Sequence, residues 1–229
     1  MEKKFTALVA GVALAFSSVA HAESWLEFEA NIGGSAYSQI YDGVWVQDGL
    51  EHHLNLTAPA VEAGLTGDIY QAGHWGASWH LDYAWLGAIH SQGLATSDAN
   101  YDPVTKKCVS ACGPLADFTG SGHDSGVLLT IEPHFDYAGW RVGVEAGPYL
   151  HTVTWSVDAN NQRENFTMAP RASHFESETG WHLGYVAGVS VEYKRFSLKY
   201  QYFKNGPKGG DPNPPIWTNT HVVTVGYRF

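Results

Sequence analysis

Long apolar runs are scarce in this 229-residue sequence. After residue 22 no stretch is long and apolar enough for a transmembrane helix, which needs about 20 predominantly apolar residues. The mean hydropathy is −0.21. If the mature chain lies in a membrane, it therefore does so as a closed β-barrel, because only helices and closed barrels satisfy all their backbone hydrogen bonds in lipid.

Basic residues are also few. The sequence has 13 Lys and Arg against 23 Asp and Glu, a formal net charge of −10 at pH 7. Nucleic-acid binding depends on clustered Lys and Arg, so this balance argues against a nucleic-acid partner. It is compatible with a protein that must stay soluble while it crosses the cell envelope.

Only two cysteines are present, Cys108 and Cys112, with three residues between them. In an oxidising compartment such a pair predicts a local disulfide. A metal site would want further Cys or His close by. We therefore expect a disulfide here, and neither a metal nor another cofactor.

The N-terminus has the features of a bacterial secretory signal peptide. Residues 1–4 include two lysines, residues 5–16 form a short apolar run, and Ala20-His-Ala22 fits the small-x-small cleavage pattern. The apolar run is too short to anchor the chain in a bilayer. We expect residues 1–22 to be removed and residues 23–229 to form one domain.

The end of the sequence reads as a strand with two different faces. Every second side chain is large and mostly apolar: His221, Val223, Val225, Tyr227 and Phe229. The alternate positions hold Thr220, Thr224, Gly226 and Arg228. This alternation, ending on an exposed aromatic, is typical of a last strand that has lipid on one face and a polar lumen on the other.

Seven further segments alternate in the same way, each near the length of a tilted transmembrane strand. With the last strand the predicted set is 24–36, 57–69, 75–90, 126–137, 140–152, 181–193, 196–203 and 221–229. In segment 75–90 the pattern places Ile89 outward and His90 inward. The fold class predicted is all-β, a closed antiparallel eight-stranded up-and-down transmembrane barrel.

The connections between these segments alternate in length. Three are short: residues 70–74, Ala138-Gly139 and Lys194-Arg195. Four are long: 37–56, 91–125, 153–180 and 204–219. Short periplasmic turns and long extracellular loops are the usual asymmetry of outer-membrane barrels.

The inward positions carry mostly acidic and titratable side chains. The polar network predicted for the lumen consists of Glu27, Glu29, Glu62, His80, Asp82, Glu132, His134, Asp136, Arg141, Glu145, His182, Glu192, Lys199 and Arg228. A barrel of eight strands is filled by side chains rather than open. Unpaired carboxylates inside it are costly, so they must share protons, pair with basic groups or hold a cation.

A two-residue turn at Ala138-Gly139 sets the register of two neighbouring strands. It places Asp136 opposite Arg141 as a buried ion pair, and Tyr137 beside Trp140 in an aromatic girdle at the periplasmic interface. The same register sets Glu132 opposite Glu145. That like-charge pair needs a cation, a proton or a slip in pairing.

These features together resemble the small eight-stranded outer-membrane barrels of the OmpA/OmpX type. The closing residues Val225-Gly-Tyr-Arg-Phe229, with Tyr227 and Phe229, are similar to the terminal signal that the barrel-assembly machinery reads in that class. The resemblance implies a monomeric barrel in the bacterial outer membrane, in contact with lipid and lipopolysaccharide. It implies no chemistry, because this architecture hosts many functions.

A local resemblance to outer-membrane lipid A deacylases concerns the segments Tyr200–Asn205, Pro212–Pro215 and Tyr227–Phe229. Tyr202 stands where that family has its catalytic His, and Lys204 where it has the nucleophilic Ser. Acyl transfer needs a nucleophile within reach of its base. The resemblance therefore implies shared architecture without the activity, and we expect no catalytic residues.

The expected function is structural or interactive: envelope integrity, adhesion, or contact with a host or phage through the long loops. A small-solute or cation-selective pore is the alternative, with the motifs His80-x-Asp82 and His134-x-Asp136 each directing two ligands inward. A lipid A-modifying enzyme is a second alternative, because Ser190, His182 and Glu192 share the inward face.

Overall fold

The computed structural model describes residues 26–41, 51–95, 101–102, 104–105, 107–108, 116–162, 171–178, 180–204 and 216–229. The predicted signal peptide, residues 1–22, lies outside them, so its removal stays a prediction. Within the described residues, no helix is long and apolar enough to cross a bilayer.

Eight long antiparallel strands close into a ring in the described part of the chain. They are β1 (Glu27–Tyr41), β3 (Thr57–Ala72), β4 (Trp75–Ala95), β7 (Ala116–Tyr137), β8 (Trp140–Gln162), β10 (His182–Tyr193), β11 (Phe196–Lys204) and β12 (Ile216–Arg228). Each pairs with the next in this order, and β12 pairs with β1. The predicted closed up-and-down barrel is confirmed.

Four short strands lie within segments that we expected to be loops. They are β2 (His52–Asn55), β5 (Tyr101–Asp102), β6 (Lys107–Cys108) and β9 (Arg171–Glu178). Of these, β2 pairs with β4, β9 pairs with β8, and β5 pairs with β6. The long strands also outrun their predicted bounds, so segments 91–125 and 153–180 are only partly loop.

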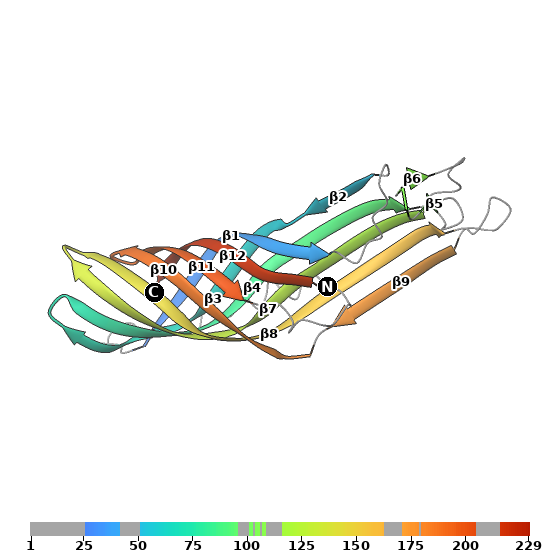
Figure 1. Cartoon of the computed structure of the whole chain (residues 1–229). Coiled ribbons are helices and arrows are strands. Elements are labelled where there is room, and N and C mark those ends of the chain that lie inside the picture. Colours follow the sequence, from blue (N-terminus) through green and yellow to red (C-terminus); the bar gives the residue numbers. More distant parts are fainter. Residues whose placement is uncertain are drawn as a thin grey trace.

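The extra length gathers on one side of the barrel. β4, β7 and β8 have 21, 22 and 23 residues, whereas about 9–11 residues cross a membrane. Residues 88–95, 116–125 and 153–162 of these strands, with β2 and β9, form what we call the protruding sheet. Figure 1 shows it reaching past the other strands at the end opposite the short turns.

A β-bulge separates the protruding sheet from the barrel in β4. The pairing of β4 with β7 shifts between Trp85 and Ala88, and Gly87 has a φ of +84°. A bulge inserts one residue and so reverses the faces beyond it. Ile89 is therefore fully buried and His90 exposed, and the prediction that Ile89 faces outward and His90 inward is wrong.

The outer face of the barrel is a belt of exposed apolar side chains. Half or more of the surface of Ile131, Val144 and Val225 is exposed. At the end with the short turns the belt becomes aromatic, where the rings of Trp140 and Tyr193 lie 4.7 Å apart and those of Trp75 and Phe135 lie 5.0 Å apart. Exposed apolar surface on this scale needs lipid to cover it, with aromatic rings at the interface.

Candidate functional site

The interior of the barrel has three zones. An ionic rim lies at the end with the short turns, a buried charged layer follows it, and an apolar layer fills the lumen beyond. Because inward positions alternate with outward ones along every strand, each zone draws its side chains from strands far apart in sequence.

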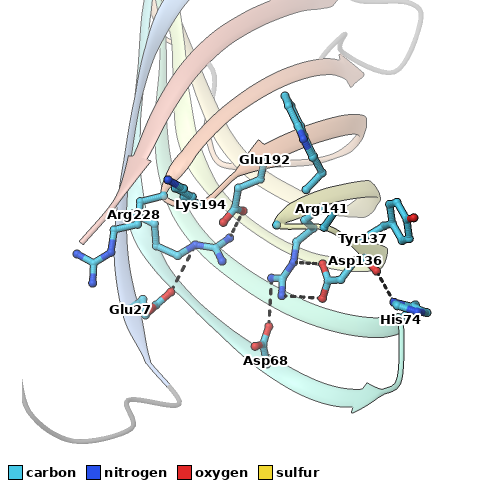
Figure 2. A pocket seen from close by; sticks show the side chains of 13 residues that line it. Glu27, Asp68, His74, Asp136, Tyr137, Arg141, Glu192, Lys194 and Arg228 are labelled. Atoms are coloured by element: carbon cyan, nitrogen blue, oxygen red, sulfur yellow. Dashed lines mark hydrogen bonds and ion pairs between the residues drawn. The ribbon is translucent and has the colours of Figure 1, made fainter.

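The rim lines a cavity of about 640 Å³ (Figure 2). Arg141 Nε lies 2.9 Å from Asp136 Oδ1, and Arg141 Nη1 lies 3.3 Å from Asp68 Oδ1. The predicted register of Asp136 with Arg141 is confirmed. The prediction of a buried pair is not, because the Arg141 and Asp136 side chains are 15% and 29% exposed. They lie at the mouth of the lumen, one residue from the turn at Ala138-Gly139.

A second ionic group completes the rim. Arg228 Nη2 lies 2.9 Å from Glu192 Oε2, and Arg228 Nε lies 3.6 Å from Glu27 Oε2. Figure 2 shows both arginines turned toward the middle of the cavity, each between two carboxylates. Each guanidinium of the rim thus has two acidic partners, and both arginines are held in place by carboxylates from other strands or from across a turn.

Glu29 is the centre of the charged layer. Lys199 Nζ donates to Glu29 Oε1 over 3.1 Å, and His80 Nδ1 lies 2.9 Å from the same oxygen. All three side chains are almost completely buried. The network ties β1 to β4 and β11 across the lumen, so it braces strands that are not neighbours in the ring.

Glu132 and Glu145 form the other half of this layer. The Ser190 hydroxyl donates to Glu132 Oε2 over 2.9 Å, and the Thr130 hydroxyl donates to Glu145 Oε2 over 3.3 Å. Donor atoms of Glu132, Glu145 and His80 all lie within 4.8 Å of one another. The like-charge approach expected from the register is therefore present, and His80 joins it.

Negative charge exceeds positive charge in this layer. The buried carboxyl groups are Glu29, Glu62, Asp82, Glu132 and Glu145, and the basic groups facing them are Lys199 and His80. Asp82 Oδ1 and Glu145 Oε1 have no hydrogen-bond partner. Such groups are costly to bury uncompensated, so the layer requires protons or a cation.

The apolar layer fills the lumen on the side of the charged layer that faces away from the short turns. Its fully buried or nearly fully buried members are Tyr37, Ala60, Ala84, Leu86, Ile89, Leu128, Tyr149, Val153, Trp155, Val186, Phe203 and Val222. The rings of Tyr149 and Phe203 meet edge to face at 5.0 Å. In the described part of the chain, apolar side chains packed across so narrow a barrel fill its lumen at this level.

Sequence reasoning missed a polar cluster that lies among these apolar side chains. The Tyr149 hydroxyl donates to Asp124 Oδ1 over 2.9 Å, and His151 Nδ1 lies 3.1 Å from the same atom. Asp124 is fully buried, yet it falls in a segment that we assigned to a loop. The strand could not be recognised from the sequence because its inward row there is Gly122, Asp124 and Gly126. These residues give no alternation of apolar and polar side chains.

Two residues of the predicted lumen network, His134 and His182, belong neither to the ionic rim nor to the charged layer. His134 is buried nearer the rim, with Nε2 3.6 Å from Asp136 Oδ2. His182 is exposed and pairs in register with His151, because it begins β10 at the open end. Cys112 lies outside the described residues, so its disulfide with Cys108 stays a prediction.

The hairpin of β5 and β6, which ends at Cys108, holds one tight turn. The Thr105 hydroxyl donates to Asp102 Oδ2 over 2.6 Å and the Val104 amide donates to Oδ1 over 2.8 Å. These hydrogen bonds keep the pKa of Asp102 below its usual value, because they stabilise the charged carboxylate.

No protein-family model and no curated protein matches the chain. The attachment invasion locus protein Ail of Yersinia pestis, solved with the heparin analogue sucrose octasulfate, has 13% identity and a TM-score of 0.37, over 89% of this chain and 99% of that one. The translocator domain of the autotransporter NalP from Neisseria meningitidis has 12% identity and a TM-score of 0.24, over 100% and 98%. Likeness at this level carries no information about function. By its own closed register and apolar belt, this chain is a small β-barrel of the bacterial outer membrane.

Proposed function

We propose that this chain is a sealed outer-membrane barrel that displays the protruding sheet for contact with a partner outside the cell. The observation that carries the proposal is the length of β4, β7 and β8, which run about ten residues beyond what the membrane requires. Ordered strands of that length are not needed for anchoring, so the proposal assigns them to recognition.

The outer face of the protruding sheet is polar, unlike the belt below it. His174 Nδ1 lies 2.6 Å from Asp158 Oδ1, and the Ser121 and Ser156 hydroxyls lie 3.1 Å apart. These groups continue the outward rows of β7, β8 and β9. Such a surface suits water rather than hydrocarbon, which supports a position of the sheet outside the bilayer.

The lumen supports a structural role over conduction. The apolar layer, with Leu128, Tyr149 and Phe203 at full burial, separates the charged layer from the outer end. It also gives no support to acyl transfer by Ser190 and His182, because Ser190 is buried in the charged layer whereas His182 is exposed at the start of β10, about 26 Å away along the strand. In planar bilayers we expect no steady single-channel steps; regular steps would contradict a sealed barrel and favour the pore.

Outer-membrane lipid and lipopolysaccharide are the partners of the belt in this proposal, and the barrel acts as a monomer. The C-terminal strand supplies the assembly signal, with Phe229 ring contacts to Phe28 at 5.6 Å and Tyr227 at 4.9 Å. Phe229 is 57% exposed, so it remains open to the barrel-assembly machinery.

Attachment of bacteria to cultured cells tests the recognition role. The full chain is compared with a shortened barrel in which residues 91–120 and 156–176 are replaced by two short turns. The cuts join residues already paired or adjacent, His90 with Ser121 and Trp155 with Ser177, so the barrel itself is preserved. We expect several-fold more attachment with the full chain. Equal attachment by two equally well-assembled barrels would contradict the proposal.

A further inference from the structure

Three strands bring metal-binding donors together inside the charged layer. His80 of β4, Glu132 of β7 and Glu145 of β8 place donor atoms within 4.8 Å of one another, and their side chains are at most 3% exposed. His80 Nε2 lies 3.6 Å from Glu132 Oε2. Donors that sit about 2.1 Å from one tetrahedral ion lie about 3.4 Å apart, so this spacing is close to that of a filled site.

The hydrogen bonding of His80 prepares it as a ligand. Its Nδ1 lies 2.9 Å from Glu29 Oε1, an oxygen that also accepts from Lys199 Nζ. A carboxylate oxygen can only accept, so Nδ1 carries a proton; in the neutral imidazole this leaves the lone pair on Nε2. Nε2 has no hydrogen-bond partner. A carboxylate that holds the far nitrogen of a ligating His is the usual outer shell of a protein metal site.

Hydroxyl groups hold both carboxylates of this group in place. Each accepts one hydroxyl, Glu132 from Ser190 and Glu145 from Thr130, while Glu145 Oε1 is buried without a hydrogen-bond partner. Gly143 makes room for this arrangement, because a Cβ there would come within 2.5 Å of Glu132 Cδ. An unpartnered, fully buried oxygen beside a second carboxylate calls for a positive charge between them.

A second group of possible donors, Glu29, His80 and Asp82, is the weaker candidate. There the His80 nitrogen and the Glu29 oxygen already bind one another, and Lys199 supplies the compensating charge. The motif His80-x-Asp82 therefore does not act as a ligand pair on one strand. The ligands come instead from three strands at one level of the barrel.

We propose that the barrel binds one divalent first-row metal ion, with Zn²⁺ as the reference, between His80 Nε2 and the carboxylates of Glu132 and Glu145. One imidazole with two carboxylates suits such an ion, whereas Mg²⁺ and Ca²⁺ prefer oxygen ligands alone. The ion ties β4, β7 and β8 together from inside. Because the apolar layer and the rim enclose the site, the ion enters during folding.

The test is to refold the mature full chain into detergent micelles with Zn²⁺ or with EDTA, remove unbound metal, and measure retained metal by mass spectrometry. We expect about one Zn²⁺ per barrel and a higher unfolding midpoint than in the EDTA-refolded protein. Glu145→Gln and His80→Gln should each lower retained Zn²⁺ at least about tenfold. Glu62→Gln is the matched control, a fully buried carboxylate outside both donor groups, and should keep it.

A shared proton is the competing account of Glu132 and Glu145. Glu145→Gln imitates a protonated carboxyl, so under that account it leaves the unfolding midpoint unchanged and the unsubstituted barrel retains no zinc; this result would overturn the proposal. If the variants do not fold, X-ray absorption of the zinc-refolded unsubstituted protein decides. A nitrogen and oxygen shell with one imidazole supports the site, and water ligands alone overturn it. None of these outcomes bears on attachment.

Discussion

At the scale of single residues, the lumen depends on pairing groups that could not be buried alone. Glu29 illustrates this, because its carboxylate meets Lys199 from one strand and His80 from another. Removing one member of a buried pair leaves the other charged and desolvated, and the cost is about 3–5 kcal/mol. The main cost of breaking the pair is therefore the buried charge that is left uncompensated, rather than the loss of the net attraction between the two groups.

Lys199→Met tests this. We expect the free energy of unfolding, measured by urea titration in lipid vesicles, to fall by about 3–5 kcal/mol. Adding Glu29→Gln should restore part of the loss, because the uncompensated charge is then removed. Lys194→Met on the exposed turn is the control; it loses only a contact 5.2 Å from the Tyr193 ring, worth about 1 kcal/mol or less. Equal effects at positions 199 and 194 would refute the pairing argument.

At the scale of elements, one strand serves two environments. On β8, Val142 and Val144 are part of the apolar belt. Further along the same outward row, Asp158 and Asn160 lie on the outer face of the protruding sheet. The backbone hydrogen bonds are alike in both halves, since each pairs with β7. The outward side chains change from apolar to polar along the strand, as expected where the bilayer ends.

Arginine at two outward positions of β8 measures that boundary. Val144→Arg puts a charge against hydrocarbon and should cost about 2–4 kcal/mol in vesicles, the range for a position near the bilayer midplane. Asn160→Arg makes the same substitution on the protruding sheet and should cost less than about 0.5 kcal/mol. A large loss at both positions would show that the protruding sheet is not in water.

At the scale of the whole molecule, closure of the ring depends on its last strand. β12 pairs with β11 on one side and β1 on the other, so the barrel has no free edge once it is in place. The Phe229 amide donates to the Phe28 carbonyl over 2.8 Å. Phe229 thus lies at the seam between β12 and β1, the last and first strands of the ring.

Deleting Phe229 should reduce the amount of barrel that reaches the outer membrane. The expected loss is several-fold in heat-modifiable protein on gels, because the deletion removes the exposed terminal aromatic that we assign to assembly. Phe196→Ala is the control, since Phe196 is a girdle ring of similar exposure, 61% against 57%. If both variants assemble equally well, the assembly signal does not depend on Phe229.

The sequence was sufficient to predict the eight barrel strands, their order and the acidic lumen. Alternation with period two is a local pattern. Leu129 and Ile131 therefore indicate a strand whichever strands lie beside it. The two-residue turn at Ala138-Gly139 also fixed one register, and with it the approach of Glu132 to Glu145. The first half of β7 was not predicted because it is rich in glycine. Where residues have no side chain, an alternation of apolar and polar side chains cannot be detected.

Only the tertiary structure decided which lumen groups meet. The bulge at Gly87 reversed β4 and buried Ile89, a change that no periodicity reveals. His80 joined Glu132 and Glu145 because the stagger of the closed ring brings three strands to one level. Alternation settles the face on which a side chain lies, but its height along the barrel axis depends on the register of every strand between it and its partner.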